Sequence, residues 1–239
     1  MLKAKNVTKK FGELVAVNNL SFEVKKGQVY GIAGPNGAGK STVYNLITGN
    51  YPYEGKIEFN GQDITGLPPH RIAKEGIART FQIPETFPSL TVQKSICLGS
   101  RFGARGGLDL KHTDEIINFV GLNEERLQTT GLLNLLGKKK LMIGAALATK
   151  PEILMLDEPM AGSNAHEIIS MMDLIKKINQ ELEITIIIIE HFMKVLTELT
   201  ETLLIIESGT KICCDLPEIV TSDPRVIESY LGDAYAESK

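Results

Sequence analysis

The sequence contains little cysteine, no long apolar run and no marked excess of charge of either sign. Its only cysteines are Cys97, Cys213 and Cys214. Their spacing suits neither a disulfide framework nor a metal site, which indicates a reducing compartment such as the cytosol. No window approaches the ~20 apolar residues that cross a bilayer, and the opening segment MLKAKNVTKKFGE lacks the apolar core of a signal peptide. We therefore expect any membrane role to be carried out from the membrane surface.

The charge balance argues against a nucleic-acid-binding protein. The 239 residues include 26 Lys and Arg against 29 Asp and Glu, for a net charge of −3, whereas nucleic-acid surfaces are basic. Apolar residues make up 43% and charged residues 23%, which is typical of globular proteins. A chain of this length can bury roughly 70% of its unfolded surface. We expect one domain, 1–239, with an inserted subdomain.

The order of expected elements indicates an α/β fold. The opening is β-rich, the middle helical, and the last part alternates between strands and helices, which favours a largely parallel core sheet. Expected strands are Leu2–Val7, Leu14–Val24 with a turn at Asn18-Asn19, Val29–Ala33, Lys56–Asn60, Ile153–Leu156, Ile184–Ile189 and Leu203–Ile206. Expected helices are Lys40–Thr48, Asp114–Val120, Lys139–Ala148, His166–Leu182 and Met193–Leu199, with a glycine-rich break at Gly103–Gly107.

A glycine-dense loop follows the strand Val29–Ala33 and opens a helix. Its sequence, GPNGAGKS, matches the eight-residue P-loop pattern in the required context. Glycines let backbone N–H groups face the phosphates of a nucleotide, Lys40 reaches the β and γ phosphates, and the Ser41 hydroxyl is a ligand for Mg²⁺. This motif alone does not separate transporters from kinases or GTPases. The expected ATP-contacting residues are Gly34, Pro35, Asn36, Gly37, Ala38, Gly39, Lys40, Ser41 and Thr42.

An apolar strand, ILML, ends in Asp157 and Glu158. This placement predicts both carboxylates at the carboxyl edge of the sheet, where Asp157 holds Mg²⁺ through water and Glu158 takes a proton from the attacking water. A solvated loop end is the alternative. A second buried strand is followed by His191, which either senses the γ phosphate or serves as an ordinary structural histidine.

The order of these motifs over nearly the whole chain resembles the ABC ATPase family. The resemblance implies a P-loop NTPase with an N-terminal antiparallel β subdomain and a helical subdomain inserted at approximately 84–147. It further implies that Phe11 stacks on adenine, that Gln82 contacts Mg²⁺ and the attacking water, and that His191 is the switch histidine. From the residues alone, Phe11 is as readily a core residue and Gln82 a surface residue. The expected D-loop, which crosses to a partner subunit, includes Gly162, Ser163 and Asn164.

Finer features resemble the ATPases of branched-chain amino acid importers. They are the segment GIARTFQ at 76–82, Glu190-His191, and the tail DPRVIESYLG at 223–232. This branch implies integral-membrane permease subunits, a second ATPase subunit in a homo- or heterodimer, and a separate solute-binding protein. The chain is then peripheral on the cytoplasmic side of the cell membrane. Relatives with the same tail handle urea or other amides, so the resemblance leaves the solute open.

The signature loop of the family, Leu-Ser-Gly-Gly-Gln, is degenerate in this chain. Asn134 stands in place of the serine and Leu136 in place of a glycine, and a one-residue deletion would restore only Gly137. Leucine at a close-approach position crowds a phosphate, although Asn134 can cap the next helix. An intact acidic pair beside this loop suggests a heterodimer with two unequal sites.

Three functional classes follow from these features. The favoured class is an ATP-hydrolysing transporter subunit, with Phe87, Leu90, Thr91 and Val92 expected near a groove for a permease helix, or packed inside the helical subdomain. The alternatives are a nucleotide-binding but hydrolysis-poor regulatory subunit and an ABC protein acting on ribosomes or DNA. The last class is expected to carry tandem nucleotide domains or a coiled-coil insertion, and this chain has one set of motifs.

Overall fold

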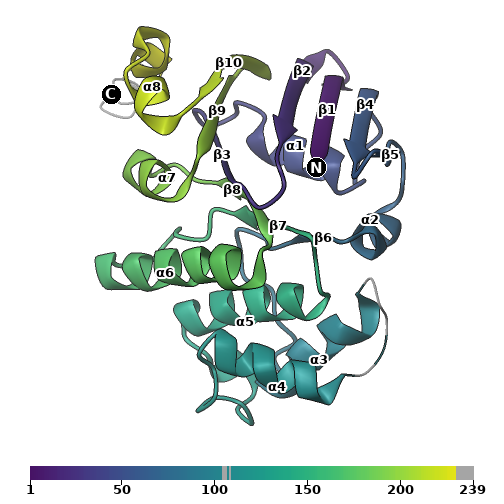
Figure 1. The fold of residues 1–239 in the computed structure, drawn as a ribbon, viewed down its shortest axis with the longest axis vertical. Coiled ribbons are helices and arrows are strands. Elements are labelled where there is room, and N and C mark those ends of the chain that lie inside the picture. The colour runs from purple at the N-terminus through teal and green to yellow at the C-terminus, as the bar shows by residue number, and fades with distance from the viewer. Residues whose placement is uncertain (104–106, 108, 230–239) are drawn as a thin grey trace. The chain divides into compact units, whose positions relative to one another are not determined.

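The computed structural model describes residues 1–103, 107 and 109–229. They form two compact units, a first unit of Met1–Pro69 with Thr185–Lys239 and a second unit of His70–Ile184. Parts of the expected break at Gly103–Gly107 and of the tail at 223–232 lie outside the described residues. Each unit is described by itself below, with element labels as in Figure 1.

An antiparallel sheet in the order β2-β1-β4-β5 opens the first unit. Its strands are β1 (Leu2–Phe11), β2 (Leu14–Val24), β4 (Glu54–Phe59) and β5 (Gln62–Asp63). The expected turn at Asn18-Asn19 is wrong, because β2 runs through both residues. Asn19 adopts a φ of 50°, and the register with β1 shifts near it, so the strand carries an irregularity instead. This sheet confirms the antiparallel β subdomain.

A second group of strands in the first unit is mostly parallel. β3 (Val29–Ala33) pairs in parallel with β8 (Thr185–Ile189) on one side and with β9 (Thr202–Glu207) on the other, and β10 (Thr210–Asp215) lies antiparallel to β9. β3 and β8 are buried throughout, as expected for strands covered on both faces. The helices here are α1 (Lys40–Ile47), α7 (Met193–Leu199) and α8 (Pro217–Thr221).

The second unit contains two parallel strands and most of the long helices. β6 (Ile77–Arg79) pairs with β7 (Ile153–Asp157). The helices are α2 (Pro69–Glu75, which begins at the boundary), α3 (Val92–Phe102), α4 (Leu110–Phe119), α5 (Leu135–Ala148) and α6 (Ala165–Leu182), with a 3-10 turn at Thr130–Leu132. Helices α3, α4 and α5 pack on one another, and Figure 1 shows them together.

Close packing of α3 on α5 in the second unit requires glycine, as Gly99 shows. A Cβ atom at Gly99 of α3 would lie 2.2 Å from the carbonyl oxygen of Ala145 in α5. Only a residue without a side chain permits this approach.

Val92, expected near a permease groove, is fully buried at the start of α3, whereas Phe87 is 64% exposed. Val92 therefore belongs to the core of this unit and not to its surface.

Candidate functional site

The P-loop lies between the end of β3 and the start of α1, and Lys40 folds back over it. Lys40 is 6% exposed, and its ammonium donates hydrogen bonds to the carbonyl oxygens of Gly34 (2.7 Å) and Pro35 (2.9 Å). Gly39 is the N-cap of α1 and makes no side-chain capping bond. The loop thus combines a fixed positive charge with an N-terminal helix turn that no side chain caps, which is the arrangement that binds phosphate groups.

Three loop glycines have backbone conformations that other residues rarely adopt. The φ angles are 153° at Gly34, 78° at Gly37 and 101° at Gly39. A Cβ atom at Gly34 would lie 1.9 Å from the Ile206 carbonyl oxygen. A Cβ atom at Gly39 would lie 2.4 Å from the Ala16 carbonyl oxygen, whereas one at Gly37 would face open space. The loop therefore needs glycine for its path against neighbouring strands, and its tip is accessible.

Phe11, at the end of β1, is a surface residue and not part of the core. The residue is 42% exposed, and its ring meets that of Tyr51 edge to face, with ring centroids 5.2 Å apart. The Lys9 ammonium lies 4.8 Å from the centre of the Phe11 ring and also bonds to the carbonyl oxygen of Pro52. Sequence reasoning missed both neighbours: Lys9 lies two residues before Phe11 in β1, and Tyr51 comes from a separate segment after α1. Together they hold an aromatic face available for stacking.

The acidic pair at the end of β7 is contacted by residues that follow β6. Asp157 is 5% exposed, and its Oδ2 lies 2.6 Å from the guanidinium Nη2 of Arg79. Glu158 is half-buried and accepts a hydrogen bond from the Gln82 side-chain amide at 2.7 Å. Gln82, Asp157 and Glu158 are thus brought together within the second unit. Arg79 was missed as a site residue, although it precedes the glutamine in the same segment.

Glu158 adopts an unusual backbone conformation. Its φ of 46° lies in the left-handed region, which is uncommon for residues other than glycine and asparagine. The turn follows a fully buried strand and leads into Pro159, also buried. The backbone therefore redirects the chain at the residue expected to act as a base.

His191 follows β8 in the first unit and is half-buried. Its backbone N–H donates to the carboxylate of the preceding residue, Glu190, at 3.2 Å, and Glu190 is only 1% exposed. The side chain is neither in the core nor fully in solvent. Its place after a buried strand agrees with both readings of this histidine, the structural and the sensing one.

The expected signature loop forms the start of α5. Asn134 is the N-cap, and its side-chain oxygen accepts a hydrogen bond from the Gly137 N–H at 2.8 Å. This confirms the expected capping role. Leu136 is half-buried, and Gly137 is buried against the Leu133 side chain. The serine hydroxyl expected in this loop is replaced by an asparagine that caps the helix, and the leucine side chain of Leu136 stands in place of an expected glycine.

A lysine of α5 connects that helix to the expected D-loop. Lys139 is 3% exposed and donates hydrogen bonds to the carbonyl oxygen of Ala161 and to the Ser163 hydroxyl (2.9 Å). In the D-loop, Gly162 has a φ of 71°, and Asn164 caps α6 in a reciprocal capping box with Glu167. The contact of Lys139 with the D-loop could not be predicted from the sequence, because its burial does not follow from its place in a run of three lysines.

The donor chemistry fits Mg²⁺. Ser41 offers an exposed hydroxyl at the start of α1, and Asp157 and Gln82 offer oxygen ligands in the second unit. Across residues 1–103, 107 and 109–229 no group of three or more His, Cys, Asp or Glu side chains is arranged to hold a metal by itself. Mg²⁺ commonly uses one or two protein oxygens together with nucleotide phosphates, and this donor set suits that mode.

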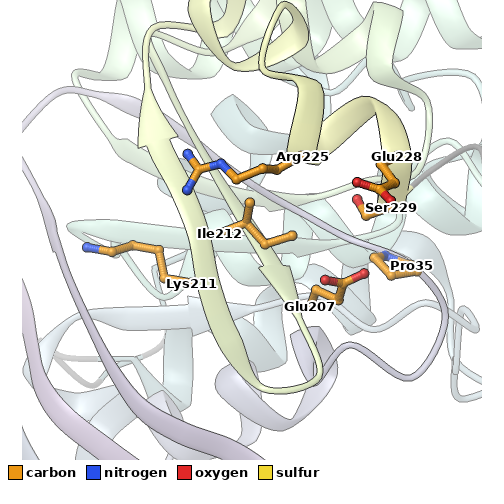
Figure 2. Close-up of a pocket in the computed structure, with 7 residues that line it drawn as sticks. All are labelled: Pro35, Glu207, Lys211, Ile212, Arg225, Glu228 and Ser229. Carbon is orange, nitrogen blue, oxygen red and sulfur yellow. The ribbon is translucent and has the colours of Figure 1, made fainter.

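One pocket of about 620 Å³ lies in the first unit beside the P-loop. Figure 2 shows Glu207 and Glu228 near Pro35, with Ile212 between these carboxylates and the cationic side chains of Lys211 and Arg225. Arg225 is held by Asp223 in a short ion pair of 2.6 Å. Residues near the C-terminus and Pro35 of the P-loop therefore line the same pocket.

Among the helices in the described part of the chain, none is both long and apolar enough to cross a membrane. The sequence matches the family model described as ABC transporter over residues 17–161. It also matches the model described as branched-chain amino acid ATP-binding cassette transporter over residues 210–236. The second match covers the tail that the sequence alone singled out.

Curated relatives are similar along nearly their whole length. BraF of Pseudomonas aeruginosa, a high-affinity branched-chain amino acid transport ATP-binding protein, is 34% identical over 98% of both chains. LivG of Escherichia coli, which carries the same description, is 33% identical over 98% of both chains. LivG of Archaeoglobus fulgidus, a probable member of the same group, is 32% identical over 97% of this chain and 95% of its own.

Solved structures support the same assignment. A crystal structure of the ADP conformation of an ATP-binding cassette of an ABC transporter has a TM-score of 0.88 and 30% identity, over 97% of this chain and 98% of its own. A dimeric post-hydrolysis cassette bound to ADP and phosphate has a TM-score of 0.81 and 26% identity, over 91% of this chain and 99% of its own. The chain belongs to the ABC transporter family, as one of its ATPases.

Proposed function

We propose that this chain binds and hydrolyses ATP to power import of branched-chain or related amino acids through a membrane permease. The observation that carries the proposal is the P-loop, in which Lys40 folds over the loop carbonyls at the uncapped start of α1. The named function of the full-length relatives supports the amino-acid substrate. The chain is then peripheral on the cytoplasmic side of the membrane. A separate solute-binding protein delivers the substrate.

The nucleotide contacts are assigned to the first unit. Phe11 stacks on adenine, because its ring is exposed and held from the side by Tyr51. The loop from Gly34 to Thr42 surrounds the phosphates, and Lys40 leaves its loop carbonyls to neutralise the β and γ phosphates. The switch role of His191 belongs to the same proposal.

The acidic pair carries the hydrolytic step. Glu158 accepts a proton from the attacking water, and Gln82, already bonded to its carboxylate, orients that water. Bound Mg²⁺, held by Ser41, Asp157 and Gln82, would supply charge neutralisation of the phosphates. Residues of about 84–147 form the inserted helical subdomain of a single nucleotide-binding domain. The D-loop from Gly162 to Asn164 meets a second ATPase subunit.

The test is ATP hydrolysis by the chain with Mg²⁺, alone and assembled with its permease and second ATPase subunit. Turnover should rise on assembly, and Glu158→Gln should lower it by about a hundredfold or more while ATP binding persists. Glu152→Gln, an exposed carboxylate before β7, is the matched control and should leave turnover unchanged. Equal turnover in the Glu158→Gln complex would contradict the assigned base.

A second function is favoured by the start of α5. Leu136 stands where the family has a glycine, and Asn134 is committed to capping the helix. A chain with this loop suits a subunit that binds nucleotide but supports little hydrolysis at the opposite site. ATP binding without turnover in every assembly would favour this regulatory function over the first.

A further inference from the structure

The Arg79–Asp157 ion pair is buried on both sides. The two side chains are 8% and 7% exposed, and the contact is 2.6 Å long. The ion pair of Arg126 with Asp114 in the same unit is 37% and 46% exposed. Exposed pairs contribute little energy, whereas removing one partner of a buried pair leaves an uncompensated charge. The positive charge of Arg79 therefore compensates the buried negative charge of Asp157.

Strand pairing fixes this contact. Arg79 ends β6 and stands opposite Met155 of β7, two residues before Asp157. The next residue, Thr80, donates its N–H to the Met155 carbonyl oxygen at 2.9 Å. The guanidinium carbon also lies 5.1 Å from the centre of the Phe81 ring, within the range of a cation–π contact. The backbone and this ring both hold the guanidinium at the carboxylate.

We propose that Arg79 is a positioning residue that makes divalent-cation binding at Asp157 depend on nucleotide. The inference rests on the proposed function, in which Asp157 serves the metal–nucleotide site. A guanidinium occupies one carboxylate oxygen and repels a second cation at short range. The attraction between Mg²⁺ and this carboxylate is then too weak for the ion to bind without nucleotide. The phosphates of ATP supply the additional negative charge that a hard cation requires.

The consequence is an ordered site. Arg79 keeps Asp157 in one orientation and keeps bare metal ions out until the nucleotide is bound. The planar guanidinium of Arg79 donates its hydrogen bonds in a fixed direction, which the ammonium of a lysine cannot reproduce. Arg79 therefore acts through two properties: its charge excludes the cation, and its planar geometry orients the carboxylate.

The test measures binding of Mn²⁺ to the full chain without nucleotide, by electron paramagnetic resonance. Arg79→Met should bind Mn²⁺ about tenfold more tightly than the wild type, because the repelling charge is gone. Arg79→Gln, which keeps a hydrogen-bond donor to Asp157, guards against misfolding and should change in the same direction. Arg79→Lys, which keeps the charge, should stay within about twofold of the wild type. Arg126→Met removes an exposed ion pair in the same unit and should have no effect.

Adding Asp157→Asn to either neutral variant should abolish the gained Mn²⁺ binding, which identifies the carboxylate as the ligand. Folded Arg79→Gln and Arg79→Met chains that bind Mn²⁺ no better than the wild type would overturn the proposal. An equal gain in Arg79→Lys would also overturn it, because charge would then not be the cause. These measurements contain no ATP, so they can fail while ATP turnover stands, and the reverse also holds.

Discussion

Phe11 and its neighbours show how the surroundings of one side chain decide its role. An exposed ring held edge to face by Tyr51 and faced by the Lys9 ammonium is ordered before any ligand arrives. A preordered ring loses little freedom on binding. The binding contribution of Phe11 should therefore come from stacking.

Phe11→Ala should weaken ATP binding by about tenfold, since stacking of a base on an aromatic side chain contributes about 1–3 kcal/mol. Fluorescence titration with a labelled ATP analogue measures this change. Phe11→Tyr keeps a stacking ring and is the matched control. If alanine and tyrosine bind ATP equally well, adenine lies elsewhere.

Cys213 provides a residue-scale prediction from its electrostatics. Burial, and then the nearby carboxylate of Asp223, raises the pKa of the Cys213 thiol. A raised pKa lowers the thiolate fraction at a given pH, and the thiolate is the reacting species. Alkylation of Cys213 at pH 8 should be slower in the folded chain than in the unfolded chain, and it should accelerate as the pH rises toward the folded-state pKa.

Mass spectrometry of timed iodoacetamide labelling, with the peptide of Cys213 followed separately, checks this expectation. Asp223→Asn removes one of the causes and should speed labelling at pH 8. Equal rates in folded and unfolded chains would show that the environment does not suppress the thiolate.

At the scale of elements, α5 and the D-loop are joined by one buried ammonium. Lys139→Met leaves the Ala161 carbonyl and the Ser163 hydroxyl without this donor. We expect the free energy of unfolding to fall by about 2 kcal/mol, since hydrogen bonds to charged groups contribute about 1.5–3 kcal/mol. Lys138→Met, one residue earlier and half-buried, should change it by less than about 0.5 kcal/mol.

Urea denaturation of the three proteins measures both changes. The same variants assembled with the second ATPase subunit show whether the lysine also sets the D-loop for the partner. Equal stability of Lys139→Met and the wild type would mean that the buried ammonium is replaced by other contacts.

The elements that could be predicted from sequence share strong local signals. The strand Val29–Ala33 and the helix Met193–Leu199 have the expected bounds, because a continuous apolar run and a clear helical period mark them. The helix α3 was missed, since its period is interrupted by Gly99, a residue required by packing against α5. The start of α5 was placed four residues too late, because the cap at Asn134 lies inside an apparent loop.

In the site, too, residues marked by local sequence signals could be predicted, and residues brought together by the fold could not. The P-loop was predictable because its chemistry is contiguous in sequence. The Arg79–Asp157 pair joins residues 78 positions apart, and Tyr51 reaches Phe11 only through the fold. Contacts of this kind depend on strand register, which a single sequence does not determine.

For the whole molecule, the unequal motifs lead to a prediction about the assembled ATPase pair. Under the proposed function, the chain keeps both carboxylates of the acidic pair, Asp157 and Glu158, but would present a leucine-bearing signature loop to the nucleotide of a second ATPase subunit. In a heterodimer, Glu158→Gln in this chain should remove most turnover, whereas the equivalent change in the partner should remove little. Single-turnover assays on purified complexes with one altered subunit measure the two sites separately. Equal losses from both changes would contradict unequal sites.

The left-handed backbone at Glu158 bears on any effort to engineer this protein. Glycine and asparagine occupy that conformation with less strain than glutamate, by roughly 1 kcal/mol. A library selected only for heat resistance would therefore enrich these two residues at position 158. The selected variants would be more heat-stable ATP-binding proteins that lack the carboxylate contacted by Gln82. Directed evolution of a more robust transporter should hold this codon constant, or score each round by transport rather than by survival on heating.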